Sequence, residues 1–133
     1  IHFLKKNKIK KLLTICKNKL NPKGKILILS LDPKRSEIPT FDLMNTKLKQ
    51  SLKRDIKIFD LILKIYPKLK KKYFVFHVKI LRINYLKMIK NRYISTLLNF
   101  NNKQIADGLI EIKNKYKKEL NFRDRLICLI IDK

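Results

Sequence analysis

The spacing of apolar residues along the chain predicts alternating helices and strands. Between residues 8 and 20 the apolar positions are three and four residues apart, which is typical of a helix with one buried face. Asn21-Pro22-Lys23-Gly24 ends this helix, because proline cannot continue it and glycine suits a turn. The run Lys25 to Leu31 that follows is apolar at consecutive positions. We therefore expect a strand that is covered on both faces, as in a parallel sheet.

The same periodicities predict the elements in the middle of the chain. Apolar residues from Leu48 to Tyr66 recur at helical spacing, and Pro67 closes the helix that they indicate. Aromatic and branched residues from Tyr73 to Ile80 predict a second strand. A short helix is expected over residues 83–90, since its apolar positions are three residues apart.

The last part of the chain carries one further helix and one further strand. Asn101 and Gln104 have the spacing of a capping box, which predicts that a helix begins there. Its expected apolar face extends as far as Leu120. A second continuous apolar strand is expected from Arg125 to Ile131. Strands with helices between them predict an α/β layer structure.

The predicted sheet is incomplete. Two of its three strands have the pattern of strands covered on both faces, and a strand of that kind needs a neighbour at each edge. We therefore interpret these strands as one side of a larger sheet. The isolated chain is expected to self-associate or to require a partner, because half a sheet exposes an apolar edge.

Several stretches resemble the carboxy-terminal half of class I S-adenosylmethionine-dependent methyltransferases, of the type that includes trans-aconitate methyltransferase. In that family a His-Trp pair follows the fourth strand, and His2-Phe3 is similar to it with Phe in place of Trp. Leu20 to Gly24 resembles the family's proline-glycine-glycine turn before the fifth strand, with Lys23 in place of the first glycine. The stretch Arg82 to Leu97 is similar to the arginine- and serine-containing stretch beyond the sixth strand, and Arg125 to Ile131 resembles the seventh, antiparallel strand.

This resemblance implies a fold and an activity. It implies a partial Rossmann-like sheet made of the last three strands, the final one antiparallel, with flanking helices. Residues 1–133 would then be the carboxy-terminal part of a methyltransferase domain, with substrate-side helices in 33–72 and 82–120. The implied reaction is methyl transfer to a small molecule of the carboxylate class, without a fixed catalytic residue, because the methyl group of the cofactor is already activated. His2 and Phe3 would border S-adenosylmethionine.

One element of the family is missing. The glycine-rich loop that cradles the cofactor after the first strand has no counterpart, since Gly24 and Gly108 are the only glycines. The sequence also starts with Ile1 and not with Met. We therefore expect a fragment of a longer enzyme, and we expect this chain by itself to be inactive.

Four residues are candidates for substrate binding. Asp32 follows a buried strand, where open α/β sheets place ligand groups, although it would equally suit the turn before Pro33. Arg92, with Tyr93 and Ser95, is a candidate for holding a carboxylate, because a guanidinium can donate two parallel hydrogen bonds to it. Surface arginines are common, so both interpretations stay open.

The charge of the chain introduces a different function. It has 34 basic and 10 acidic residues, a formal net charge of +24, which is typical of a protein that binds polyanions. Only six of the basic residues are arginine, and Lys, Ile and Asn are residues of A/T-rich codons, so compositional bias explains part of the excess. The alternative function is therefore a basic RNA-binding or organellar ribosomal protein, with Lys68 to Lys72 beside aromatic residues as its binding segment.

Other classes are disfavoured by the sequence. It contains no apolar run long enough for a transmembrane helix and no metal-ligand spacing, and we expect no membrane partner. Cys16 and Cys128 cannot form a disulfide framework and are expected in the core. Together with the absence of a signal-peptide pattern, this predicts a cytoplasmic protein.

Overall fold

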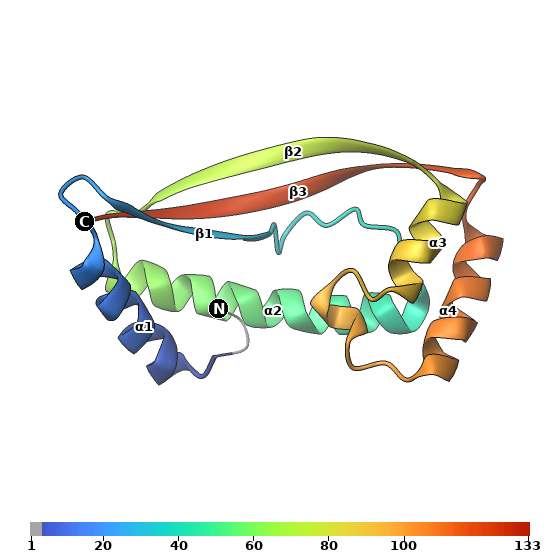
Figure 1. The fold of residues 1–133 in the computed structure, drawn as a ribbon, viewed down its shortest axis with the longest axis horizontal. Coiled ribbons are helices and arrows are strands. Elements are labelled where there is room, and N and C mark those ends of the chain that lie inside the picture. Colours follow the sequence, from blue (N-terminus) through green and yellow to red (C-terminus); the bar gives the residue numbers. More distant parts are fainter. Residues whose placement is uncertain (1–3) are drawn as a thin grey trace. The chain divides into compact units, whose positions relative to one another are not determined.

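The computed structural model describes residues 4–133, and the order of its elements follows the predicted order. In chain order these are α1 (Lys6–Lys19), β1 (Lys25–Leu31), α2 (Asp42–Ile65), β2 (Lys70–Leu81), α3 (Arg82–Lys90), the short 3₁₀ helix η1 (Ser95–Leu97), α4 (Asn102–Lys115) and β3 (Glu119–Asp132) (Figure 1). The predicted capping box is confirmed: Asn101 Oδ1 accepts from the Gln104 backbone N–H at 2.8 Å, and Gln104 Oε1 accepts from that of Asn101 at 3.0 Å.

The strands form one antiparallel sheet in the order β1-β3-β2, so the last strand of the chain lies between the first two. β1 pairs with β3 in a register that runs from Lys25 opposite Asp132 to Leu31 opposite Leu126. β2 also runs antiparallel to β3, and Lys70 Nζ lies 3.2 Å from Asp132 Oδ2. β1 and β2 therefore run in the same direction without pairing with each other.

The chain forms two compact units, and neither is a continuous segment. Among the described residues, the first unit contains 4–35, 52–75 and 125–133, and the second contains 36–51 and 76–124. Helix α2 and strands β2 and β3 each contribute residues to both units. Each unit has its own hydrophobic core.

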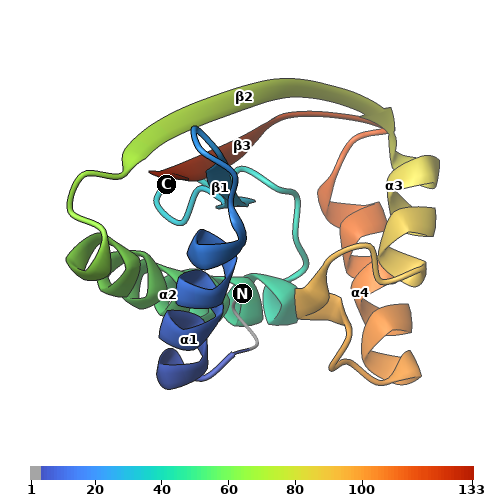
Figure 2. The same cartoon turned by 60° about the vertical axis from the view of Figure 1, so that its left-hand side comes forward.

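The core of the first unit lies between one face of the sheet and two helices. Ile9 and Leu13 of α1 pack there against strand residues, together with Ile58, Phe59 and Ile62 of α2. Both views of the fold show α1 and α2 on the same side of these strands (Figures 1 and 2). The strand residues in this core are Ile28, Ile127, Leu129 and Ile131.

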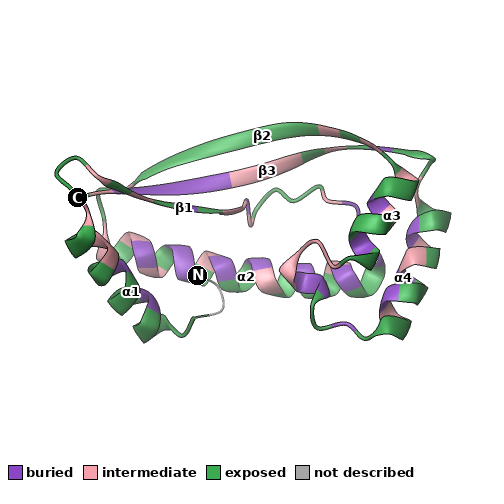
Figure 3. Cartoon of the chain, in the orientation of Figure 1, coloured by how far each residue is buried: buried purple, intermediate pink, exposed green. Residues whose placement is uncertain are grey.

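On the opposite face of the sheet in this unit, the side chains of β1 are exposed while those of β3 are buried. Leu27 and Leu29 of β1 are each 57% exposed, although they lie opposite the buried residues Ile130 and Cys128 of β3. Figure 3 shows the carboxy-terminal half of β3 as buried and most of β2 as exposed. The prediction of a strand covered on both faces is therefore confirmed for residues 127–131 of β3 and wrong for β1.

The core of the second unit is built around α3 and α4. Tyr85 and Ile89 of α3 pack with Ile105 and Ile112 of α4, and Phe41 lies among them with 2% exposure. A Cβ atom on Gly108 would lie 2.7 Å from the ring of Phe41, so only glycine permits this close approach.

Several predicted boundaries are wrong: α2 begins at Asp42 and not near Leu48, β2 begins at Lys70 and not at Tyr73, and the last helix ends earlier than expected. Leu120 was expected on the apolar face of the last helix, but α4 ends at Lys115 and Leu120 lies in β3. The residues from Glu119 to Phe122 alternate between exposed and more buried positions, which is the period of a strand. The strand predicted from Arg125 therefore begins six residues earlier, at Glu119.

Candidate functional site

The carboxyl end of β1 is the first candidate site, and Asp32 lies directly after this strand. Its side chain is buried, and Oδ1 accepts a hydrogen bond from the Lys34 backbone N–H at 3.0 Å. Its own backbone N–H donates to the Arg125 carbonyl at 2.8 Å. Asp32 therefore fixes the turn that leaves the sheet, and its place at the end of β1 agrees with the position predicted for a ligand-binding group.

A small cavity opens beside Asp32. Its volume is about 90 Å³, and its lining includes Lys34, Phe59 and Tyr73 in addition to Asp32. One water molecule takes up about 30 Å³ of liquid, so this space corresponds to about three waters. The cavity beside Asp32 is thus one corner of a binding site and not a complete pocket for a metabolite.

The three other candidates for substrate binding lie together in the second unit, between α3 and α4. Nη2 of Arg92 donates to the Phe100 carbonyl at 2.8 Å and to Asn102 Oδ1 at 3.1 Å. The Tyr93 hydroxyl lies 2.9 Å from the Tyr85 hydroxyl. Ser95 begins η1, and its carbonyl accepts from the Leu98 backbone N–H. Arg92 therefore ties its loop to the start of α4, and its role with a carboxylate stays a prediction.

The backbone before α2 is held by tyrosine hydroxyls from two other segments. Tyr85 donates to the Pro39 carbonyl at 2.7 Å, so the proton between the two tyrosine oxygens comes from Tyr93. Tyr116 accepts from the Thr40 backbone N–H at 3.0 Å and donates to the Thr40 carbonyl at 3.1 Å. These contacts fix the path of the chain into α2.

Burial determines which chemistry these hydroxyls can perform. Burial is the largest of the causes that raise the pKa of Tyr93 to about 12, and the charge of Asp124 acts in the same direction. Burial also raises the pKa of Tyr85 well above its ordinary value, again with Tyr93 and Asp124 contributing. Both tyrosines are thus protonated at neutral pH, and they can donate hydrogen bonds but cannot act as general bases.

Asp124 is the polar residue that sequence reasoning missed. Its Oδ1 atom is buried and has no hydrogen-bond partner among residues 4–133. An acidic residue just before the apolar run of a strand was the available signal, since a carboxylate in such a place usually needs a partner. The two tyrosines that it influences are 39 and 31 positions away in the chain, which no local pattern reveals.

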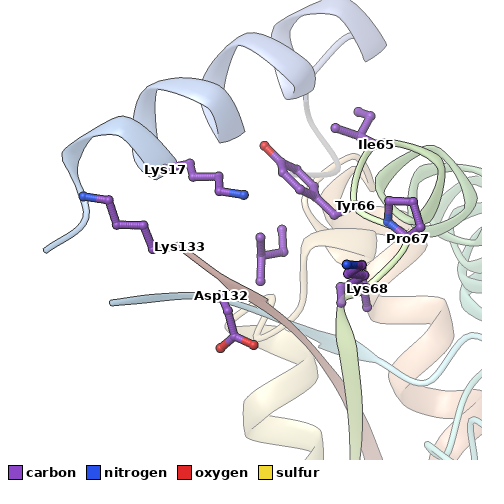
Figure 4. A pocket seen from close by; sticks show the side chains of 9 residues that line it. Lys17, Ile65, Tyr66, Pro67, Lys68, Asp132 and Lys133 are labelled. Atoms are coloured by element: carbon purple, nitrogen blue, oxygen red, sulfur yellow. The ribbon is translucent and has the colours of Figure 1, made fainter. Parts of the chain in front are cut away.

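A second cavity of the first unit lies at the opposite end of β1, where that strand begins. It has a volume of about 470 Å³ and is lined by the end of α2 and by residues from α1 and the end of β3. Figure 4 shows Lys17 of α1 extending toward Tyr66, and its Nζ atom lies 5.1 Å from the centre of that ring. Asp132 is paired with Lys25 and Lys70, and the Lys133 ammonium donates to the Leu20 carbonyl. Most charged groups of this cavity are therefore engaged within the protein.

The described residues do not fit S-adenosylmethionine by themselves. Gly24 ends a turn in which its N–H donates to the Asn21 carbonyl at 2.9 Å, and Gly108 is packed against Phe41. Neither glycine lies in a loop that is open to a cofactor, and the cavity beside Asp32 is too small for a nucleoside. His2 and Phe3, which the resemblance places beside the cofactor, lie outside the described residues.

Two further kinds of feature are absent from residues 4–133. No group of three or more His, Cys, Asp or Glu side chains lies in a position to bind a metal ion. Within the same range, no helix has the length and apolar composition needed to cross a bilayer. Cys128 is buried and Cys16 is partly buried, and both are free thiols.

Comparison with known proteins adds no assignment. No family model and no curated protein sequence matches the chain.

Proposed function

We propose that this chain is the carboxy-terminal flank of a class I S-adenosylmethionine-dependent methyltransferase that acts, when complete, on a small carboxylate. The observation that carries the proposal is the open edge of β1, at which Leu27 and Leu29 have neither a pairing strand nor a covering layer among the described residues. Residues 33–72 and 82–120 would contribute helices to the substrate side. The cofactor would be held chiefly by residues beyond those described, because this chain lacks a cradle for it.

The topology of the sheet supports the proposal. β1 and β2 run in the same direction and are joined through the long helix α2, as in the β-α-β units of doubly wound sheets. The last strand, β3, is antiparallel to β1, which the resemblance requires of the final strand. Its residues 127–131 are buried on both faces, so β3 occupies an interior position in the sheet.

The free edge of β1 supports it as well. In the pairing with β3, the Asp32 N–H donates to the Arg125 carbonyl and the Lys133 N–H to the Gly24 carbonyl. Because hydrogen-bonded pairs alternate in an antiparallel ladder, the N–H groups of Leu27 and Leu29 point away from β3. No described strand pairs with them. The same two leucines expose their side chains, so within residues 4–133 β1 has no neighbour at the edge away from β3 and no covering layer over these leucines, as a strand in the middle of a larger sheet would after removal of its other half.

The turn before β1 gives independent support. The resemblance places the first glycine of the family's turn at Lys23, and Lys23 has a φ of 68°. This is the left-handed region, which glycine adopts without strain and a lysine adopts only at a cost of about 1–2 kcal/mol. The backbone thus has a glycine conformation at the position where the family has glycine.

The experiment compares two proteins. One is the chain of residues 1–133, and the other is the same chain extended by the residues encoded upstream of Ile1. Binding of S-adenosylmethionine is measured by isothermal titration calorimetry, and methyl transfer is measured with a panel of small carboxylates. The extended protein is expected to bind the cofactor, and the 133-residue chain is not.

Two results would contradict the proposal. The first is an extended protein that contains a glycine-rich loop and still shows no heat of binding. The second is an upstream reading frame that encodes no strand followed by such a loop. In the extended protein, Asp32→Asn and Arg92→Lys test the substrate residues. They are expected to raise KM for the carboxylate while leaving cofactor affinity unchanged.

A further inference from the structure

The charge of the chain is distributed unevenly along its length. Residues 1–31 contain nine lysines, no arginine and no acidic residue, whereas all ten acidic residues lie from Asp32 onward. Residues 61–106 also contain no acidic residue, so the absence of carboxylates is not particular to residues 1–31; what distinguishes α1 is that six of its 14 residues are lysine and none is acidic. Helix α1 is therefore the most strongly basic element of the first unit.

Helix α1 presents this charge to solvent. Only Ile9 and Leu13 of α1 are buried, and the lysines in its first half are exposed. At 3.6 residues per turn, Lys6 and Lys10 lie on one side of the solvent face and Lys8 and Lys19 on the other. Between these two sides lies a polar line along the helix, made of Asn7, Lys11, Thr14 and Asn18, all of which are exposed. The apolar side chains of Leu12 and Ile15, 40% and 48% exposed, lie between Lys8 and Lys19 on their side of the helix.

The protein itself does not neutralise these lysines. Among residues 4–133, no ion pair joins a carboxylate to a lysine of α1. Among the described residues, Lys17 is the one lysine of α1 whose ammonium group lies over an aromatic ring, that of Tyr66. The remaining lysines form a concentrated positive surface with free ammonium groups, which a polyanion would complement.

We propose that the solvent face of α1 binds the phosphate backbone of double-stranded RNA. Lysine ammonium groups act as point charges on phosphates, and without arginine or an aromatic side chain on this helix, neither bidentate base recognition nor base stacking is available. Binding is therefore independent of base sequence. The amide and hydroxyl groups between the two sides can bond ribose 2′-hydroxyls, which the wide, shallow minor groove of an RNA duplex displays.

This activity does not depend on the methyltransferase proposal, because α1 carries it without a cofactor. The probe is a fluorescein-labelled RNA duplex of mixed sequence and about 20 base pairs, which exceeds the span of known double-strand-binding modules. Fluorescence anisotropy gives the dissociation constant between about 50 and 200 mM salt, where counterion release dominates. The unmodified chain is expected to show a slope of log affinity against log salt of about −4, as for four to five phosphate contacts.

Two charge-matched variants locate the contact. The first is K8Q/K10Q/K11Q on α1, and the second is K47Q/K49Q/K53Q on α2, where these lysines are also exposed. Lysine and glutamine have similar helix propensities, and circular dichroism verifies that both variants keep their helices. The α1 variant is expected to bind at least tenfold more weakly at about 100 mM salt, with a slope smaller in magnitude by about 3. The α2 variant, with the same net charge, is expected to change affinity less than about threefold.

Three results would overturn the proposal. Equal losses in the two variants would show that binding follows total charge and not α1. A DNA duplex of the same sequence is expected to bind about fivefold more weakly, which corresponds to one lost hydrogen bond, and equal affinity would exclude the 2′-hydroxyl contacts. Binding to vesicles of anionic phospholipid without binding to the RNA duplex would assign the surface to membranes. None of these results bears on cofactor binding by the extended protein, so the two proposals fail separately.

Discussion

The hydroxyl oxygens of Tyr85 and Tyr93 lie 2.9 Å apart, and the Tyr85 hydroxyl donates its own hydrogen bond to the Pro39 carbonyl at 2.7 Å. This chain of hydrogen bonds links α3, the loop after it and the segment that enters α2. The two tyrosines therefore have different roles in this chain of hydrogen bonds: the Tyr85 hydroxyl is both a donor and an acceptor, whereas the Tyr93 hydroxyl is only a donor.

Replacing each tyrosine with phenylalanine shows how much its hydroxyl contributes to the free energy of unfolding. Tyr85→Phe leaves the buried Pro39 carbonyl and the Tyr93 hydroxyl without partners, so the free energy of unfolding is expected to fall by about 1–3 kcal/mol. Tyr93→Phe removes one donor and leaves Tyr85 bonded to Pro39, and the expected loss is about 1 kcal/mol. Urea unfolding followed by circular dichroism gives both values. A loss for Tyr93→Phe equal to or greater than that for Tyr85→Phe would contradict the proposed order of donors.

The same pair predicts how stability depends on alkaline pH. The folded pKa of Tyr93 is about 12, because burial raises it, whereas the unfolded value is about 10. A raised folded pKa contributes stability that is fully present below pH 10 and is lost as pH rises toward 12. Burial raises the pKa of Tyr85 as well, which gives the same sign.

The measurement is the free energy of unfolding between about pH 8 and pH 12, together with the tyrosinate absorbance of the folded chain. We expect stability to decline above pH 10, and the decline to be shallower in Tyr93→Phe. Full ionisation of all five tyrosines near pH 10 in the folded chain would show that neither tyrosine is buried as described.

Replacing Gly108 with alanine has two opposing effects on stability. Replacing an interior helical glycine with alanine ordinarily stabilises a helix by about 1 kcal/mol. Here the new Cβ atom would lie 2.7 Å from Phe41, whose ring is buried and packs 5.7 Å from that of Phe100, so it cannot move aside freely. We expect Gly108→Ala to lower the free energy of unfolding by about 1–3 kcal/mol, because overpacking dominates.

The control for this variant is the double variant Gly108→Ala with Phe41→Leu. The smaller side chain removes the clash, so the double variant is expected to be more stable than the sum of the two single effects. Thermal unfolding of the four proteins gives this coupling. Additive effects would show that the close approach of Gly108 to Phe41 does not limit the packing.

Lys23→Gly is expected to stabilise the chain. Lys23 has a φ of 68°, and glycine relieves the strain of this conformation, although it adds flexibility to the unfolded chain. The expected net gain is about 1 kcal/mol in the free energy of unfolding by urea. Lys10→Gly, at an exposed position inside α1, is the control and is expected to cost about 1 kcal/mol. A loss of stability in Lys23→Gly would contradict the strained turn.

The elements that sequence predicted best are those whose signals are local. The capping box at Asn101 and Gln104 was found because both bonds form within one helical turn. The extent of β3 was not found, because Tyr116 and Leu120 fit helical spacing while Glu119 to Phe122 also fits the alternation of a strand. In this stretch β3 lies beside β2, and Lys79 Nζ of β2 is 3.4 Å from Glu119 Oε1 of β3.

The site was harder to predict than the elements. Asp32 was identified correctly as the residue at the end of a strand, since its position depends on its neighbours in sequence. The partners of Arg92 and Tyr93 were not predicted, because the tyrosine contact to Pro39 joins residues 46 positions apart. The open face of β1 was missed for a related reason, since an apolar run shows that a strand can be covered on both faces and not that the covering residues are present.

Amide hydrogen exchange in β1 tests the central claim, that this strand borders the missing part of a larger sheet. In the chain of residues 1–133, the amides of Ile26 and Ile28 point toward β3 and are expected to be protected, while those of Leu27 and Leu29 exchange rapidly. In the protein extended upstream of Ile1, the amides of Leu27 and Leu29 are expected to become protected at least a hundredfold as a new strand pairs with them. Unchanged rapid exchange of these two amides in a folded extended protein would contradict the account.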